Sequence, residues 1–108
     1  MADSFKAREK GAEAKYALDE ETRFKVMARR NKLLGLWAAG EMGVAGPAAD
    51  AYAKEVVAAD FEEAGDEDVL RKVARDFATK GIARDNPAIR AKMDELLAIA
   101  GEQIVAEK

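Results

Sequence analysis

Three cationic side chains and one amide occupy consecutive positions at Arg29, Arg30, Asn31 and Lys32, just before an apolar run that ends at Trp37. Guanidinium forks and an ammonium group suit phosphate oxygens, and an asparagine amide can read a base edge or a ribose hydroxyl. Successive residues of a helix point about 100° apart, so the four side chains cannot all face one ligand. Two interpretations therefore stay open: a phosphate or partner contact, or a solvated basic turn beside core positions.

Six carboxylates surround one glycine in the stretch DFEEAGDEDV, residues 60–69. An EF-hand loop beginning at Asp60 would place Gly65 correctly at the sixth position, but it also needs a bidentate glutamate at the twelfth. The twelfth residue is Arg71, so the calcium-loop template fails. The same residues are also expected where one helix ends at a glycine and the next helix begins with an acidic first turn. Divalent-ion binding is the alternative.

The residue types that common catalytic sites need are missing. The sequence has no histidine and no cysteine, which removes imidazole acid-base chemistry, thiolate chemistry, disulfides and the usual zinc ligand sets. Hydroxyl groups outside tyrosine are limited to Ser4, Thr22 and Thr79, and there is no P-loop motif. We therefore predict that the protein is not an enzyme, holds no metal and requires no cofactor.

The N-terminal stretch, residues 3–21, is highly charged and has only three large apolar side chains, Phe5, Tyr16 and Leu18. Ordering a chain costs roughly 1–2 kcal/mol of backbone entropy per residue. Burying one large apolar side chain returns only about 1.5–3 kcal/mol. The composition nevertheless suits a helix, with Phe5 and Tyr16 on one thin face. We expect a flexible, intrinsically disordered arm that becomes helical on a partner.

Apolar residues recur at helical spacing along the rest of the chain, and the alternation typical of strands is scarce. We predict an all-α protein with helices over 19–42, 47–64 and 67–80 and a last helix with Asn86 as its N-cap. The predicted core positions of the first two helices are Phe24, Val26, Met27, Leu33, Leu34, Trp37, Ala38, Tyr52, Ala53, Val56, Val57 and Phe61. Those of the last two helices are Leu70, Val73, Ala74, Phe77, Ile89, Met93, Leu96, Leu97, Ala100 and Ile104.

Length and charge set the domain organisation and exclude some partners. With 108 residues, the chain suits one compact domain, which we divide into an arm at 1–18 and a four-helix bundle at 19–108. A net charge of −3 argues against general nucleic-acid binding. The sequence has neither a signal peptide nor an apolar run long enough to cross a membrane. We expect a cytoplasmic protein.

Two long stretches of the sequence resemble a known family. KAREKGAEAKYALDEETRFKVMARRNKLLGLWAA and AYAKEVVAADFEEAGDEDVLRKVARD are similar to the zeta subunit, the ATPase inhibitor of alphaproteobacterial F-type ATP synthases. The resemblance implies a four-helix bundle with an inhibitory arm, which enters an interface between the alpha and beta subunits of the ATP synthase head and reaches the central rotor. It places the protein peripherally at the membrane, through the ATP synthase.

The resemblance also implies roles for particular residues. The inhibitory arm would bind the ATP synthase through Phe5, Lys6, Arg8, Glu9, Lys10, Glu13, Lys15 and Tyr16. The bundle would bind adenine nucleotide, ADP or ATP, as a regulatory ligand, for which we nominate Arg29, Arg30, Asn31 and Lys32. The alternative function is a nucleotide-sensing helical module whose arm has no inhibitory action.

Overall fold

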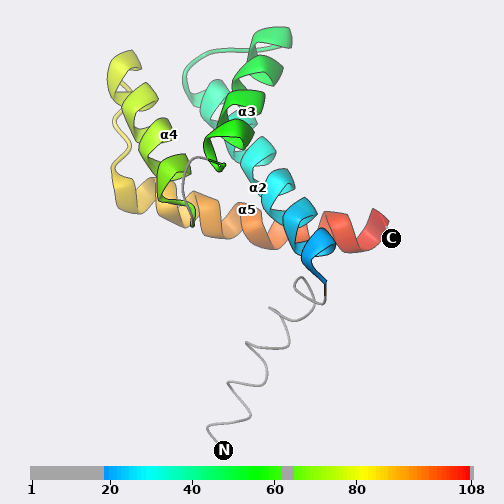
Figure 1. Cartoon of the computed structure of the whole chain (residues 1–108). Helices are drawn as coiled ribbons and strands as arrows, with labels where there is room; N and C mark the ends of the chain where they lie inside the picture. The colour runs from blue at the N-terminus through cyan, green and yellow to red at the C-terminus, as the bar shows by residue number, and fades with distance from the viewer. Residues whose placement is uncertain (1–18, 62–64, 108) are drawn as a thin grey trace, which may run out of the picture.

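The computed structural model describes residues 19–61 and 65–107, and these form four α-helices (Figure 1). The helices are α2 (Glu20–Glu41), α3 (Pro47–Ala59), α4 (Glu67–Lys80) and α5 (Asn86–Glu107). The described part contains no strand, so the predicted all-α four-helix class is confirmed. The predicted arm, residues 1–18, lies outside the described residues.

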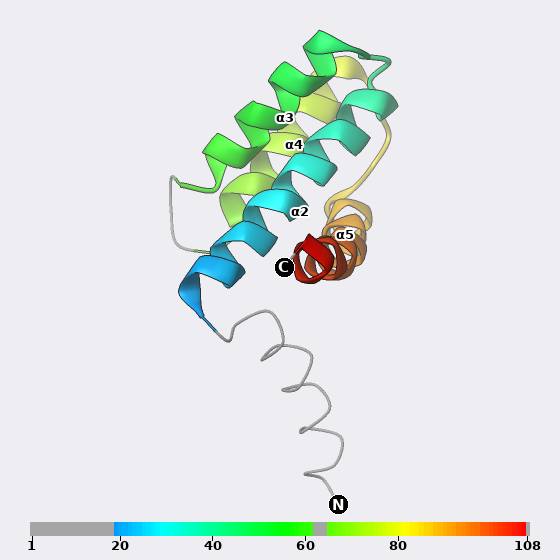
Figure 2. The ribbon, with the colours of Figure 1, turned by 90° about the vertical axis from the view of Figure 1, so that its right-hand side faces the viewer.

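Helix α2 is central to the arrangement, because it packs most extensively against α3 and α5. Figure 2 shows α2, α3 and α4 running side by side, whereas α5 is seen end-on and so crosses them. The short connection between Met42 and Gly46 turns the chain back, so that α3 runs antiparallel to α2 (Figure 1).

The ends of the helices follow local capping chemistry, with two corrections to the predictions. Asp19 caps α2 by accepting a hydrogen bond from the Thr22 backbone N–H at 2.6 Å. The cap of α5 is Asp85, which accepts from the backbone N–H of Ala88 at 3.0 Å, so the prediction of Asn86 as N-cap was wrong. Helix α3 was predicted to reach residue 64, but it ends at Ala59 and a turn follows.

The main apolar core draws residues from all four helices. Its buried members are Leu34, Ala38, Val56, Val69, Val73, Phe77, Ile89 and Met93. A smaller cluster of Val26, Ala100 and Ile104 joins the N-terminal half of α2 to the C-terminal half of α5. The predicted inward stripes of α4 and α5 supply most of these residues.

The closest approach of two helices lies between α2 and α3. A Cβ atom added to Gly35 would stand 2.5 Å from the Cα of Ala53, a distance that real Cβ atoms do not reach. Only glycine therefore lets the two backbones come this close. Nearby, Trp37 lies edge-on to Phe77 with ring centroids 5.5 Å apart.

Two aromatic residues that we predicted as core are exposed. Phe24 is 58% exposed and Phe61 is 67% exposed, so both predictions were wrong. The two rings contact each other, with centroids 5.9 Å apart. Residues of α2 that we had not placed in the core, Arg30 and Asn31, are buried instead.

Candidate functional site

The four residues of the predicted nucleotide site start from one turn of α2 but point in different directions. Arg30 and Asn31 are each 1% exposed and lie inside the protein. The Arg30 Nε donates a hydrogen bond to the Asn31 side-chain oxygen at 2.7 Å. Both side chains are therefore part of the interior packing.

Asp66 is the carboxylate that faces the buried Arg30. The Arg30 guanidinium reaches one Asp66 oxygen at 3.4 Å, and Arg90 of α5 binds the other at 2.9 Å. Arg90 also reaches Glu67 at 3.0 Å. Asp66 holds the N-cap position of α4, but its side chain makes no capping hydrogen bond. It links α2, α4 and α5 instead.

The charges of this cluster shift one another's pKa. Burial alone would raise the pKa of Asp66, but hydrogen bonding and charge from Arg90, with those from Arg30, hold it below its ordinary value. Burial lowers the pKa of Arg30 against the opposing charge of Asp66. Among the described residues, the buried Arg30 Nη2 and Asn31 Nδ2 have no acceptor. Within this part of the chain, the cluster is therefore only partly satisfied.

The remaining two residues of the predicted site lie on different surfaces. Arg29 faces α5, where it donates to Gln103 at 2.8 Å and pairs with Glu107 at 2.8 Å. Lys32 is exposed beside α3. Of the four nominated residues, only Lys32 lies on a free surface suited to a ligand.

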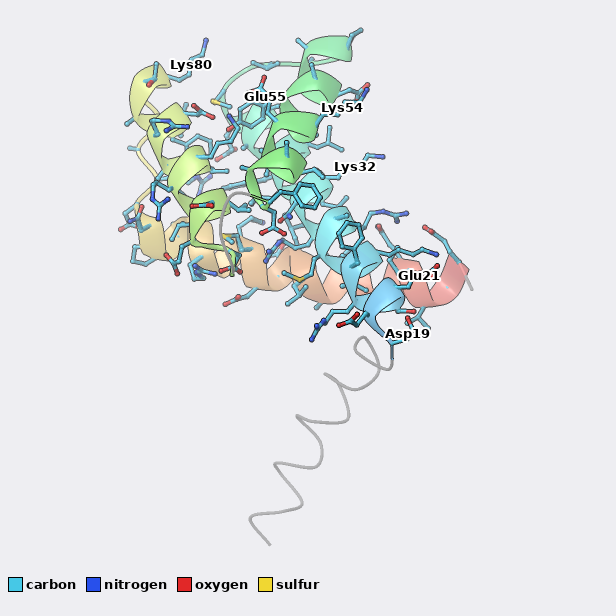
Figure 3. All side chains as sticks on the ribbon, in the orientation of Figure 1. Asp19, Glu21, Lys32, Lys54, Glu55 and Lys80 are labelled. Carbon is cyan, nitrogen blue, oxygen red and sulfur yellow. The ribbon has the colours of Figure 1, made fainter. Side chains whose placement is uncertain are left out.

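A shallow groove beside Lys32 carries a second lysine. Lys32, Asp50, Ala53, Lys54 and Val57 line this groove, whose volume is about 460 Å³. Figure 3 shows Lys32 on α2 and Lys54 on α3 on the same side of the molecule, both pointing into solvent. Two ammonium groups against one carboxylate favour an anion. Sequence reasoning missed Lys54, because its place beside Lys32 depends on how α3 packs.

A second polar cluster joins α3 to α4. The Tyr52 hydroxyl donates to Asp76 at 2.7 Å, and the Lys72 ammonium bridges Asp76 at 3.1 Å and Glu55 at 3.0 Å. Burial alone would lower the pKa of Lys72, but its hydrogen bonds to Glu55 and Asp76 raise it. Burial, with the hydrogen bond to Asp76, raises the pKa of Tyr52 well above its ordinary value. These contacts fasten one helix to the other.

Three carboxylates of the acidic stretch pair with arginines within the protein. Asp68 is buried and binds Arg71 at 2.6 Å, while Asp66 and Glu67 bind arginines as described above. Within residues 19–61 and 65–107, no group of carboxylates is arranged to hold a metal ion. In the same ranges, no helix is both long enough and apolar enough to cross a bilayer.

The residues nominated for the inhibitory arm, Phe5 to Tyr16, lie outside the described residues. They do fall within the match to a known family, because the profile described as ATPase inhibitor subunit zeta covers residues 1–103. A solved chain, described as a solution NMR structure, is 52% identical, with a TM-score of 0.71. That match covers 80% of this chain and 98% of the solved one. The comparison with curated proteins gave no match. Because the family profile spans nearly the whole sequence, this chain belongs to the ATPase inhibitor subunit zeta family.

Proposed function

We propose that this protein inhibits ATP hydrolysis by an F-type ATP synthase and is itself a non-catalytic regulator. The observation that carries the proposal is the family match, which extends over residues 1–103 and so includes the N-terminal stretch. The protein would act in the cytoplasm, held at the membrane through the ATP synthase. No known catalytic motif in the sequence competes with this regulatory role.

In the proposed mechanism, residues 1–18 fold as a helix into an interface between an alpha and a beta subunit and contact the central rotor. Two observations support it. The sequence of this stretch has too few large apolar residues to fold alone. The described helices contain two apolar clusters of their own, which supply the bundle with a core. The bundle would carry the arm, and the arm would block rotation.

The first test measures ATP hydrolysis by the isolated cognate ATP synthase head. The full chain should inhibit, and a version that lacks residues 1–18 should not. Phe5→Ala and Tyr16→Ala in the full chain should each weaken inhibition about tenfold or more, because buried aromatic residues dominate interface energies. Full inhibition by the shortened chain would refute the arm mechanism, and no inhibition by the full chain would refute the function.

Helix formation by the arm can be tested at Gly11. Glycine within a helix costs about 0.5–1 kcal/mol relative to alanine, so Gly11→Ala should strengthen inhibition about two- to fivefold if the arm folds on binding. Gly40→Ala is the matched control, because it makes the same change in α2, where a Cβ meets nothing within 4 Å. Raised helicity of the arm peptide without stronger inhibition would contradict coupled folding.

Adenine nucleotide binding is a second candidate function, favoured by the groove that holds Lys32 and Lys54. We propose that ADP or ATP places its phosphates between these two ammonium groups. Titrating ADP while recording amide chemical shifts should give shifts at the groove, and Lys32→Ala or Lys54→Ala should weaken binding. Arg29→Ala is the control, since Arg29 pairs with Glu107 elsewhere. Shifts centred on Arg29 instead would reject this groove, and regulation by the arm-deleted chain would favour a nucleotide sensor.

A further inference from the structure

Phe24 and Phe61 form an exposed aromatic patch near the start of α2. Among the described residues, these two side chains and Ile99 are the large apolar groups that remain exposed. The two phenylalanines contact each other across α2 and the turn after α3, whereas Ile99 is on α5. Adjacent exposed aromatic rings are typical of protein interfaces.

The interior beneath the patch explains why the rings stay outside. Phe24 shares one face of α2 with Met27, Ala28 and Asn31, and these residues line a small cavity together with Phe61. Asn31, whose buried Nδ2 has no acceptor among the described residues, is one of the polar residues in this lining. The volume of this cavity is about 20 Å³, which leaves no room for a phenyl ring. The aromatic patch is thus not misplaced core that a small shift could bury.

The surroundings of the patch restrict the partner's chemistry. A hollow of about 620 Å³ adjoins both rings, and its charged lining residues are Glu20, Arg23, Asp60 and Asp66. Asp66 is already bound by two arginines, while Glu20 and Asp60 make no ion pair within the described part. The patch is therefore apolar at its centre, and its edge carries the carboxylates of Glu20 and Asp60 together with the Arg23 guanidinium. An apolar surface with lysine or arginine opposite the two carboxylates would complement it.

We infer that the Phe24–Phe61 patch is a second contact surface for the ATP synthase head, and this inference rests on the proposed function. Helix α2 begins at Glu20, directly after the stretch that is proposed to bind the head. Phe24 is only five residues from Asp19, about 8 Å along a helix. A protein that binds residues 1–18 would therefore have part of its surface close to the patch. The contact with residues 1–18 and the contact with the patch would then be continuous.

The test compares full-length variants in the ATP hydrolysis assay. Phe24→Ala and Phe61→Ala should each raise the concentration for half-maximal inhibition about tenfold, as loss of an aromatic anchor does. The double variant should raise this concentration by less than the product of the two single increases, because the rings contact each other. Ile99→Ala is the control and should leave inhibition unchanged. All variants should keep their Tm within about 4 °C, since these side chains are exposed.

The outcomes separate the inference from the proposed function. If the unmodified chain inhibits and both phenylalanine variants inhibit equally well, the patch is not a contact surface and only the inference falls. If the unmodified chain does not inhibit, both fall. A photoreactive benzoylphenylalanine at position 61 of the full chain should form an adduct with a head subunit. An adduct formed solely with a second copy of this chain would overturn the inference in favour of self-association.

Discussion

The two halves of α2 are held in place by different forces. In the C-terminal half, Leu34 and Ala38 are buried in the apolar core, and Gly35 lets α3 approach closely. In the N-terminal half, the buried residues are Thr22, Val26 and Arg30, and the Arg30 guanidinium faces the Asp66 carboxylate. Apolar packing with a close backbone approach holds the C-terminal half, whereas the N-terminal half combines a small apolar cluster around Val26 with the Arg30–Asp66 ion pair.

This difference matters because a buried ion pair contributes little net stability, whereas apolar packing contributes much. A buried donor without an acceptor costs about 1–3 kcal/mol, and among the described residues the Arg30 Nη2 and the Asn31 Nδ2 have none. We therefore expect the N-terminal half of α2 to open more easily than the C-terminal half. That half leads directly into the stretch proposed to fold on the ATP synthase.

The largest effect is expected from a cavity in the apolar half. Phe77 is fully buried against Trp37, so Phe77→Ala should lower the free energy of unfolding by about 3–5 kcal/mol. Urea unfolding followed by circular dichroism measures this loss. A cost below about 1 kcal/mol would mean that packing does not dominate this half, and the comparison would fail.

Removing the carboxylate from the polar half should cost somewhat less. Asp66→Asn leaves Arg30 buried without its counter-charge, and we expect a loss of about 2–3 kcal/mol, below the value for a fully buried pair because Asp66 is partly exposed. Glu67→Gln is the matched control, since its ion pair with Arg90 is exposed and should contribute less than about 1 kcal/mol. Equal losses for the two variants would show that burial of Arg30 is irrelevant.

A pair of glycine substitutions within α2 should change stability in opposite directions. Gly35→Ala places a Cβ against the Ala53 backbone and should cost about 1–3 kcal/mol. Gly40→Ala meets no atom within 4 Å and should add about 0.5–1 kcal/mol through helix propensity. Thermal unfolding of both variants gives the comparison. If Gly35→Ala also stabilises, the close approach of α2 and α3 is not as described.

The smallest expected effect is on the pH dependence of stability. The pKa of Asp66 in the folded protein lies below its ordinary value of 3.8, so this group adds stability that is fully present above that value. The contribution is lost as the pH falls through the lowered pKa, because protonation breaks the arginine pairs. Unfolding measured from neutral to acid pH should show a shallower decline for Asp66→Asn than for the unmodified chain. Parallel curves would exclude Asp66 as a source of acid sensitivity.

Helix periodicity predicted most of the fold, since the inward stripes of α4 and α5 depend on local sequence. On α2 the prediction held for Val26, Leu34 and Ala38 but failed at Phe24, whose stripe lies beside the one that contains Val26. Periodicity alone cannot say which of two adjacent faces points inward. The choice depends on the packing of α5, whose Ala100 and Ile104 contact Val26.

The candidate site was harder to predict because its geometry depends on contacts between distant residues. Burial of Arg30 requires Asp66, which is 36 residues further along the chain, and no local pattern records that pairing. For the same reason the groove partner Lys54 was missed. What the sequence did indicate correctly was that consecutive helical residues 29–32 could not all face one ligand.

Trp37 is a fluorescent probe that lies in the C-terminal half of α2. It is the single tryptophan of the chain, and its ring lies within 5.5 Å of the cationic groups of both Arg84 and Lys92. Its emission should therefore follow unfolding around the C-terminal half of α2, whereas circular dichroism follows the loss of all helices together. Denaturation curves from the two signals would coincide if both halves of α2 melt in one step. An earlier midpoint by circular dichroism would reveal partial melting that begins beside the N-terminal stretch.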